Sequence, residues 1–509
     1  MTPVPPQVGL GNPTSRTRVG PQPPLGPSAL PDYALFLARH GTQGFSQEVL
    51  QEIRQFPGGH GAWVDNQLGL AGAVDDSALE AILADPFYDD LWKTPAQLYA
   101  KYEPLGANAL DELVGLAQGA TILRGILSRR QLFERIVEFW TDHFNVWINK
   151  DSSLKVFKVV EDGRIIRPHA LGKFKDILRA SAQSAAMLRY LNGDKNVAGA
   201  PNENYAREVM ELHTLGVDVL YGEQDISEAA KLFTGWTFID DPLDPQLGVF
   251  HFDAANHSTQ NPITVLGVPY TAGDVTDGEQ FLDDLAALPE TAEFVCGKLI
   301  LWLLGVPLPT PRHDQVVGTF IATGGDIALT VREILSDASI HAALATGPGF
   351  KRPSRFAVGL VRQLSADIGP LGMGVQGVGK GLSAMGQLPF NWPPPTGYPI
   401  SKEAWGSDVY GRWSFANALL SGLLASFNVT VPDAVIDGVI GSAGNYAELR
   451  NNVEAVLLGG PMDATDRSAL LDHIVDLFTN LPSGTLPEQR VLVRDAIVFA
   501  ASLPSYQFD

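Results

Sequence analysis

The sequence predicts a mostly α protein, with a large multi-helix body, a small β-hairpin insert and long Pro/Gly-rich loops. Three observations support this fold class. Apolar residues recur at the spacing of amphipathic helices over most of the chain. One segment, residues 237–268, is rich in the β-branched, aromatic and turn-forming residues of a hairpin. The 51 glycines and 36 prolines among 509 residues exceed ordinary usage and predict long irregular connections.

Changes in composition divide the chain into three parts. Residues 1–30 form a Pro-rich arm without the apolar core of a signal peptide, so no signal peptide is expected in this chain. Residues 31–345 are the main helical body, with the hairpin insert near 236–268. Residues 346–509 form a C-terminal helical region with a long loop at 366–412, and we expect it to pack on the same body. Loops of that length are usually functional or cover a surface.

The helices are placed by periodicity and by capping residues. Ser46 is an expected N-cap, breaks are expected near Gly119 and Gly172, and Asp225 is an expected N-cap with Glu228 completing a capping box. The glycine-rich run 372–379 lacks a strand–helix frame and is predicted to be loop. The predicted helices cover residues 33–40, 46–53, 76–83, 94–102, 110–149, 157–191, 203–215, 225–235, 274–288, 290–305, 315–321, 327–336, 354–364, 415–426, 446–457, 466–478 and 488–501. The hairpin strands are predicted at 236–239 and 248–252.

Charge and composition exclude several classes of function. The 57 acidic against 36 basic residues give a net charge of −21, which opposes binding to nucleic acid or to an anionic membrane. The longest apolar run, residues 299–306, is too short to cross a bilayer. The single cysteine, Cys296, lies in an apolar run and is expected in the core. The composition does not exclude a protein partner, and it does not determine the oligomeric state.

The stretch from Gly199 to Gly216 is the most informative one. Asn202 is an expected N-cap and Gly216 an expected helix stop. At about 100° per residue, an apolar side faces an ordered set of polar side chains, which we call the polar arc. The polar arc consists of Glu203, Asn204, Arg207, Glu208 and Glu211. The simpler interpretation is a solvated helix face with a Glu203–Arg207 pair.

A second helix, residues 132–147, places His143 in the middle of its apolar face. A buried imidazole needs a polar partner, and the polar arc is the segment richest in acceptors. We therefore expect a buried contact between His143 and a carboxylate of the arc, against the alternative of an ordinary core histidine. His213 lies about 160° around the helix from Glu211 and is expected only to stabilise the helix end.

Two chemistries are compatible with this expected contact. In the first, a divalent metal is the cofactor, held by His143, Glu208 and Glu211, although the spacing lacks the usual Glu-x-x-His pattern of bundle sites. In the second, a carboxyl group with a raised pKa acts as general acid beside Arg207 without a metal. The catalytic candidates are Glu208, Glu211, Arg207 and His143, and the binding candidates are Asn202, Glu203, Asn204, His257 and Trp236.

Several motifs together resemble the bacterial family of unknown function called DUF1800, over roughly residues 33–508. They include Gly199-Ala-Pro-Asn-Glu-Asn-Tyr-Ala-Arg-Glu-Val-Met-Glu-Leu-His-Thr-Leu-Gly216, Leu232-Phe-Thr-Gly-Trp236, Phe139-Trp-Thr-Asp-His-Phe144, Ala38-Arg-His-Gly41, Phe294 with Lys298-Leu, Lys351-Arg-Pro353 and Leu503-Pro-Ser-Tyr-Gln-Phe508. The resemblance implies a mostly helical protein that is often exported, hence secreted or periplasmic, but it implies no established activity. The expected lack of a signal peptide points instead to the cytoplasm. The chain reads His257-Ser-Thr-Gln-Asn-Pro262 where the family tends to read His-Asp-x-Gly-x-Lys.

Two functions from different classes follow. The first is a carboxylate- and histidine-dependent hydrolase acting on an extracellular polymer or a small ester. The alternative is a non-catalytic scaffold or binding subunit of a protein assembly, in which the same polar groups hold helices together.

Overall fold

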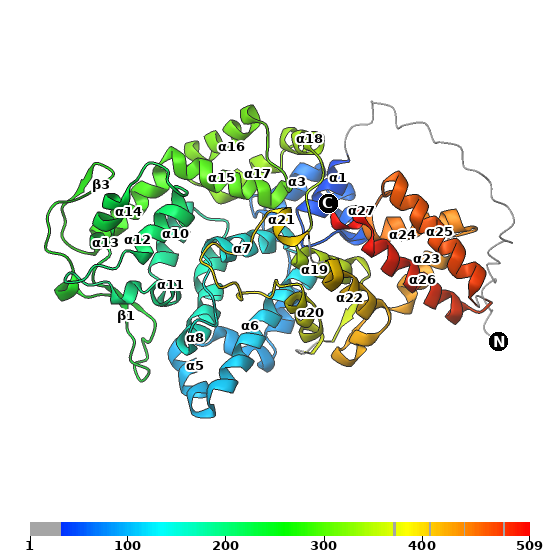
Figure 1. Ribbon diagram of the computed structural model, residues 1–509, viewed down its shortest axis with the longest axis horizontal. Helices are drawn as coiled ribbons and strands as arrows, with labels where there is room; N and C mark the ends of the chain where they lie inside the picture. Colours follow the sequence, from blue (N-terminus) through cyan, green and yellow to red (C-terminus); the bar gives the residue numbers. More distant parts are fainter. Residues whose placement is uncertain (1–31, 370–372, 407–408, 442, 482–483) are drawn as a thin grey trace. The chain divides into compact units, whose positions relative to one another are not determined.

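The computed structural model describes residues 32–369, 373–406, 409–441, 443–481 and 484–509 (Figure 1). The predicted fold class is confirmed, because these residues form 27 α-helices and sheets of two strands each. The predicted Pro-rich arm lies outside the described residues. No described helix combines the length and the apolar character needed to span a bilayer.

The chain forms two compact units. The first contains the described residues up to Trp63, then Pro348–Gly386 and Ser401–Asp509. Its long helix α26 packs against α22, α23, α24 and α25, while α19 packs against α20, α22 and α24. Its elements are α1 (Tyr33–His40), α2 (Gln47–Gln55), α19 (Pro353–Gln363), β5 (Asp367–Ile368), α20 (Met373–Ala384), α21 (Lys402–Trp405), α22 (Val409–Leu420), η7 (Leu423–Phe427), β6 (Val429–Thr430), α23 (Asp433–Gly441), α24 (Tyr446–Leu458), α25 (Ala464–Asn480), α26 (Leu486–Ser502) and α27 (Pro504–Gln507).

The second unit contains Val64–Gly347 and Gln387–Ile400. Helix α3 (Gly59–Gln67) has residues in both units. The first half of the second unit contains α4 (Ser77–Leu83), η1 (Pro86–Trp92), α5 (Pro95–Tyr102), η2 (Glu103–Leu105), α6 (Ala107–Leu127), α7 (Gln131–His143), α8 (Ser152–Glu161), η3 (Asp162–Ile166), α9 (Arg167–His169), α10 (Phe174–Ala182), α11 (Ala185–Tyr190) and η4 (Gly193–Lys195).

The second half of this unit carries the polar arc and the hairpins. Its elements are α12 (Asn204–Glu208), η5 (Val209–Thr214), α13 (Glu223–Leu232), β1 (Trp236–Phe238), β2 (Phe250–Phe252), η6 (Ala254–Asn256), β3 (Ile263–Val265), β4 (Val268–Tyr270), α14 (Val275–Ala287), α15 (Pro289–Leu304), α16 (Thr310–Ala322), α17 (Ile327–Ile334) and α18 (Asp337–Thr346). In Figure 1, α12, α13 and α14 form one green group beside α10, and the packing of α13 on α12 and of α14 on α10 confirms it.

The expected hairpin is present. Strands β1 and β2 pair antiparallel with Trp236 opposite Phe252. A second hairpin, β3–β4, pairs Ile263 with Tyr270 and packs on α13. The predicted burial of the cysteine is also confirmed, since Cys296, a residue of α15, is fully buried.

Three local predictions were wrong. Helix α6 continues through Gly119, and the break falls at Ser128, whose side chain donates to Asp76 Oδ2 over 2.7 Å. From Met373 on, the glycine-rich run is not loop but part of α20, where a Cβ on Gly377 would come within 2.9 Å of Cβ of Phe427. Glycine there serves close packing rather than a turn.

The start of α13 is the third difference. The helix begins at Glu223 with Gly222 as N-cap, and Asp225 accepts a hydrogen bond from the Gly222 N–H over 3.0 Å. Asp225 thus plays the part expected of Glu228, one turn earlier in the chain.

Candidate functional site

The helix that carries the polar arc changes its winding in the middle. Its first part, α12, is α-helical, and its second part, η5, is a π-helical turn from Val209 to Thr214. The side chain of Asn202 accepts from the Asn204 N–H over 3.0 Å, and Gly216 ends the helix with φ of +94°. The N-cap position is therefore Glu203 and not the expected Asn202, whose side chain instead binds the first N–H of the helix from one residue earlier.

His213, which lies on the π turn, packs beside His143, a contact that the sequence did not predict. His213 is buried, and its ring lies 6.0 Å from the ring of His143 and 5.1 Å from that of Phe144. The prediction that His213 only stabilises the helix end was wrong, because its ring is buried against the rings of His143 and Phe144.

His143 is buried as expected, but its predicted carboxylate partner was wrong. Its Nε2 lies 3.0 Å from the backbone carbonyl of His213, and its Nδ1 lies 3.0 Å from Nζ of Lys298. A carbonyl can only accept, so Nε2 carries the hydrogen and Nδ1 accepts from the lysine. Burial first, and then the charge of Lys298, hold the pKa of His143 well below its usual range. The ring is therefore neutral, and it joins α7, η5 and α15.

Lys298 was missed as a site residue, although it is a single lysine within the apolar sequence of α15. Burial lowers its pKa to about 8, opposed by the charge of Asp142. Its Nζ also lies 5.3 Å from the centre of the Phe294 ring. A lysine with a lowered pKa beside two neutral histidines is the kind of perturbed cluster that marks candidate sites.

Arg207 lies at the centre of a surface ion-pair network. It makes two hydrogen bonds to Glu223, of 2.8 and 2.7 Å, and longer ion pairs of 3.5 Å to Glu203 and 3.6 Å to Glu211. These hydrogen bonds raise the pKa of Arg207. The expected Glu203–Arg207 pair is present. The strongest partner of Arg207, however, is Glu223, which comes from the next helix and was not predicted.

Glu208 differs from its neighbours in the polar arc. It is half-buried and makes no hydrogen bond or ion pair with any residue of the described ranges. Burial, and then the negative charge of Glu211, raise the pKa of Glu208, while Arg207 opposes the shift. Its charge also contributes, after burial, to the raised pKa of Tyr190, whose hydroxyl donates to the Pro393 carbonyl over 2.6 Å.

A Pro-rich loop, residues 388–398, packs on the end of α7. Asn145 donates from Nδ2 to the carbonyls of Trp392 and Pro394 over 2.9 and 2.8 Å. Gly397, with φ of +69°, lies so close that an added Cβ would be 2.0 Å from the Asp142 carbonyl oxygen. The loop therefore fixes the segment that carries His143.

The predicted metal ligands do not come together. Among the residues that the structure describes, the group whose ligand atoms all lie within 4.8 Å of one another is Glu293, His313 and Asp314, not His143 with Glu208 and Glu211. Both ring nitrogens of His143 are already hydrogen bonded. The Glu293 group lies at the surface, where His313 Nδ1 is 3.3 Å from Glu293 Oε2.

The other binding candidates lie in the hairpin region. His257 is buried, and its Nδ1 lies 2.8 Å from the Thr234 carbonyl. Trp236 is buried in β1 between the rings of Phe233 and Phe250. Both residues contact the segment directly after α13, whereas Asn204 is exposed at the start of α12.

The model of the family described as "Protein of unknown function (DUF1800)" matches residues 36–508, nearly the whole chain. The chain belongs to the DUF1800 family. No curated protein and no solved structure matches it. In this DUF1800 protein, the block that carried the resemblance, residues 199–236, contains the π turn, Glu208 and the strand residue Trp236. The loop that departs from the family pattern keeps His257 as a buried contact to Thr234.

Proposed function

We propose that this DUF1800 protein is a hydrolase of a small ester or of an extracellular polymer, with Glu208 as general acid and Glu211 as general base. One observation carries the proposal: Glu208 is a half-buried carboxyl group without a partner among the described residues, and its pKa is raised. A carboxyl group that keeps its proton to higher pH can donate it during catalysis. A structural carboxylate in such a position would normally be paired.

The proposed reaction needs water and two proton transfers. The Glu211 carboxylate takes a proton from water as the water oxygen bonds to the carbonyl or anomeric carbon. The bond from that carbon to the leaving oxygen breaks, and the leaving oxygen takes the proton of Glu208. Arg207, 3.6 Å from Glu211, orients the second carboxylate. The substrate-binding candidates lie at the N-terminal end of the polar arc and are Asn202, Glu203 and Asn204.

His143 acts in this proposal as a positioning residue. Its two ring nitrogens are engaged by the His213 carbonyl and Lys298, so it has no free nitrogen with which to bind a metal or substrate. The contact holds the arc helix against α7 and α15, and so fixes the direction in which Glu208 points.

The same contacts favour a second candidate, a scaffold or binding subunit. The His143–His213–Lys298 cluster joins three elements, and Arg207 joins α12 to α13 through Glu223. Networks of this kind can be retained for the rigidity they give alone. In that case the polar arc would present a surface to a protein partner and would turn over no substrate.

Glu208→Gln is expected to lower kcat by about a hundredfold or more, because general acid catalysis typically contributes that much. Its melting temperature should stay close to that of the wild type, since the carboxyl group has no partner to lose. The measurement is hydrolysis of a panel of nitrophenyl esters and nitrophenyl glycosides.

Glu228→Gln is the matched control, because it removes a carboxylate of the neighbouring helix α13 that lies outside the polar arc and is paired with Lys231. It should retain activity. If the panel is hydrolysed equally by wild type and Glu208→Gln, Glu208 is not the acid. An earlier melting transition in Glu208→Gln with no turnover in any sample would support the scaffold.

A further inference from the structure

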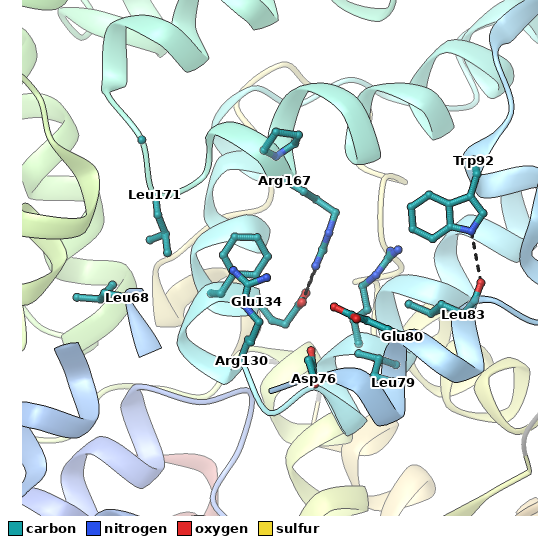
Figure 2. A pocket seen from close by; sticks show the side chains of 14 residues that line it. Leu68, Asp76, Leu79, Glu80, Leu83, Trp92, Arg130, Glu134, Arg167 and Leu171 are labelled. Atoms are coloured by element: carbon teal, nitrogen blue, oxygen red, sulfur yellow. Dashed lines mark hydrogen bonds and ion pairs between the residues drawn. The ribbon is translucent and has the colours of Figure 1, made fainter. Parts of the chain in front are cut away.

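A separate cavity of about 650 Å³ opens in the second unit (Figure 2). It lies between α4, the start of α7 and the segment that follows the π-helical turn η3. Its lining mixes apolar side chains, among them Leu68, Leu79, Leu83, Phe133 and Leu171, with three arginines and three acids. The volume is in the range of sites for small organic ligands.

The acidic side chains of the cavity are mostly satisfied. Figure 2 shows Arg167 and Glu134 pointing toward one another, and their two hydrogen bonds measure 3.0 and 2.5 Å. Asp76 accepts from the Ser128 hydroxyl and from the Arg129 N–H. The remaining acid, Glu80, is exposed at the edge.

Two arginines of the cavity, by contrast, have guanidinium N–H groups that donate no hydrogen bond to the described residues. Arg124 is 6% exposed, yet its guanidinium makes no hydrogen bond within the described residues. Its ion pair with Asp162 is 3.8 Å long, beyond hydrogen-bond distance. Burial, and then the charge of Arg167, lower the pKa of Arg124.

Arg130 is in a similar position. It lies half-buried over the Phe133 ring, 3.9 Å from the ring centre, and its guanidinium has no hydrogen bond or ion pair with the described residues. In a chain with an excess of 21 negative charges, two guanidiniums in one cavity without a hydrogen bond to any described residue are an unusual arrangement.

We propose that this cavity binds a small amphipathic carboxylate, with its oxygens on Arg124 and Arg130 and its apolar body against the leucines and Phe133. Planar guanidinium groups match a carboxylate with paired hydrogen bonds. The indole of Trp92, which donates to the Leu83 carbonyl over 3.4 Å, lies at the edge of the cavity and extends its apolar wall.

The charge balance favours a carboxylate over a phosphate ester. Three arginines face three acids around the cavity, and Asp162 lies beside Arg124. With Asp162 counted, four acids surround three arginines, so a dianion would add two negative charges where acids already outnumber arginines, whereas a monoanion adds only one. The proposal uses no residue of the polar arc and does not depend on the proposed hydrolase activity.

The test is titration calorimetry of the full chain with octanoate, octyl phosphate and octanol, three probes with the same apolar body. Octanoate is expected to bind saturably. Octanol is expected to bind with an affinity at least about tenfold lower, because it offers no charge to the arginines. Arg130→Gln should weaken octanoate binding about tenfold or more. Glu208→Gln should bind octanoate as the wild type does.

Arg129→Gln is the matched control, since Arg129 is the exposed neighbour that does not line the cavity. Its affinity for octanoate should be unchanged. Arg124→Gln gives a second test, and if that buried change prevents folding, Arg130→Gln with Arg130→Lys still decides the question. Absence of octanoate binding, equal binding of octanol, or an unaltered affinity in Arg130→Gln would overturn the proposal. Tighter binding of octyl phosphate would overturn the choice of carboxylate.

Discussion

Gly397→Ala is expected to lower the free energy of unfolding by about 3 kcal/mol, because it introduces both backbone strain and an overlap. Gly397 has φ of +69°, a conformation that residues with a Cβ rarely adopt. The new Cβ would also lie 2.0 Å from the Asp142 carbonyl oxygen and 2.7 Å from its carbon. These atoms belong to the backbone of α7 and cannot rotate away, so the loop must move off the helix.

Gly267→Ala is the matched control for this substitution. Gly267, in the turn between β3 and β4, has φ of +78°, but an added Cβ would meet nothing within 4 Å. It should lose only about 1 kcal/mol, from the strained conformation alone. Urea unfolding of the two variants measures the difference. Equal losses would mean that the loop is not held closely on α7.

Acidification is expected to destabilise the protein through its buried histidines. Burial, and then the charge of Lys298, lower the pKa of His213 to about 3, against about 6.5 in an unfolded chain. Between these pH values the unfolded chain binds more protons than the folded one, so the free energy of unfolding falls as the pH falls. The expected slope is about 1.4 kcal/mol per pH unit for each such histidine. The pKa of His143 is shifted in the same direction.

His213→Phe isolates this contribution. The Nε2 of His213 is buried without a partner among the described residues, and its ring lies among aromatic rings. Phenylalanine keeps the shape and removes the titrating group. We expect the variant to be at least as stable as the wild type at pH 7, and to lose less stability between pH 6.5 and pH 4. Urea unfolding across that range provides the measurement. Identical slopes would exclude His213 as a source of the acid sensitivity.

Much of the fold could be predicted because its signals are local. Ser46 caps α2 by accepting from the Val49 N–H over 3.2 Å, and Gly216 ends the arc helix at a positive φ. The strands of the β1–β2 hairpin were found from their aromatic and β-branched residues. The helix in the glycine-rich run was missed because Gly377 is explained by packing against Phe427, which lies far along the chain.

The candidate site was predicted less well, and for physical reasons. The ring of His213 lies beside that of His143, although the sequence predicted only a helix-end role for it. The partner of His143 is a backbone carbonyl, which no residue type reveals, and a lysine from α15, 155 positions along the chain. Glu223 likewise joins the network from another helix. Such long-range partners depend on the packing of helices, which periodicity does not specify.

Whether Glu208 can act as a general acid is tested most directly by an infrared titration of its carboxyl group, taken as the spectrum of the wild type minus that of Glu208→Gln. We expect a protonated carboxyl signal that disappears in the variant and titrates above the usual glutamate pKa of about 4.3. We also expect that Glu211→Gln moves this titration to lower pH, because the neighbouring negative charge helps to raise the pKa of Glu208. A Glu208 signal that titrates at or below the usual value, unmoved by Glu211→Gln, would contradict the assignment of Glu208 as a general acid.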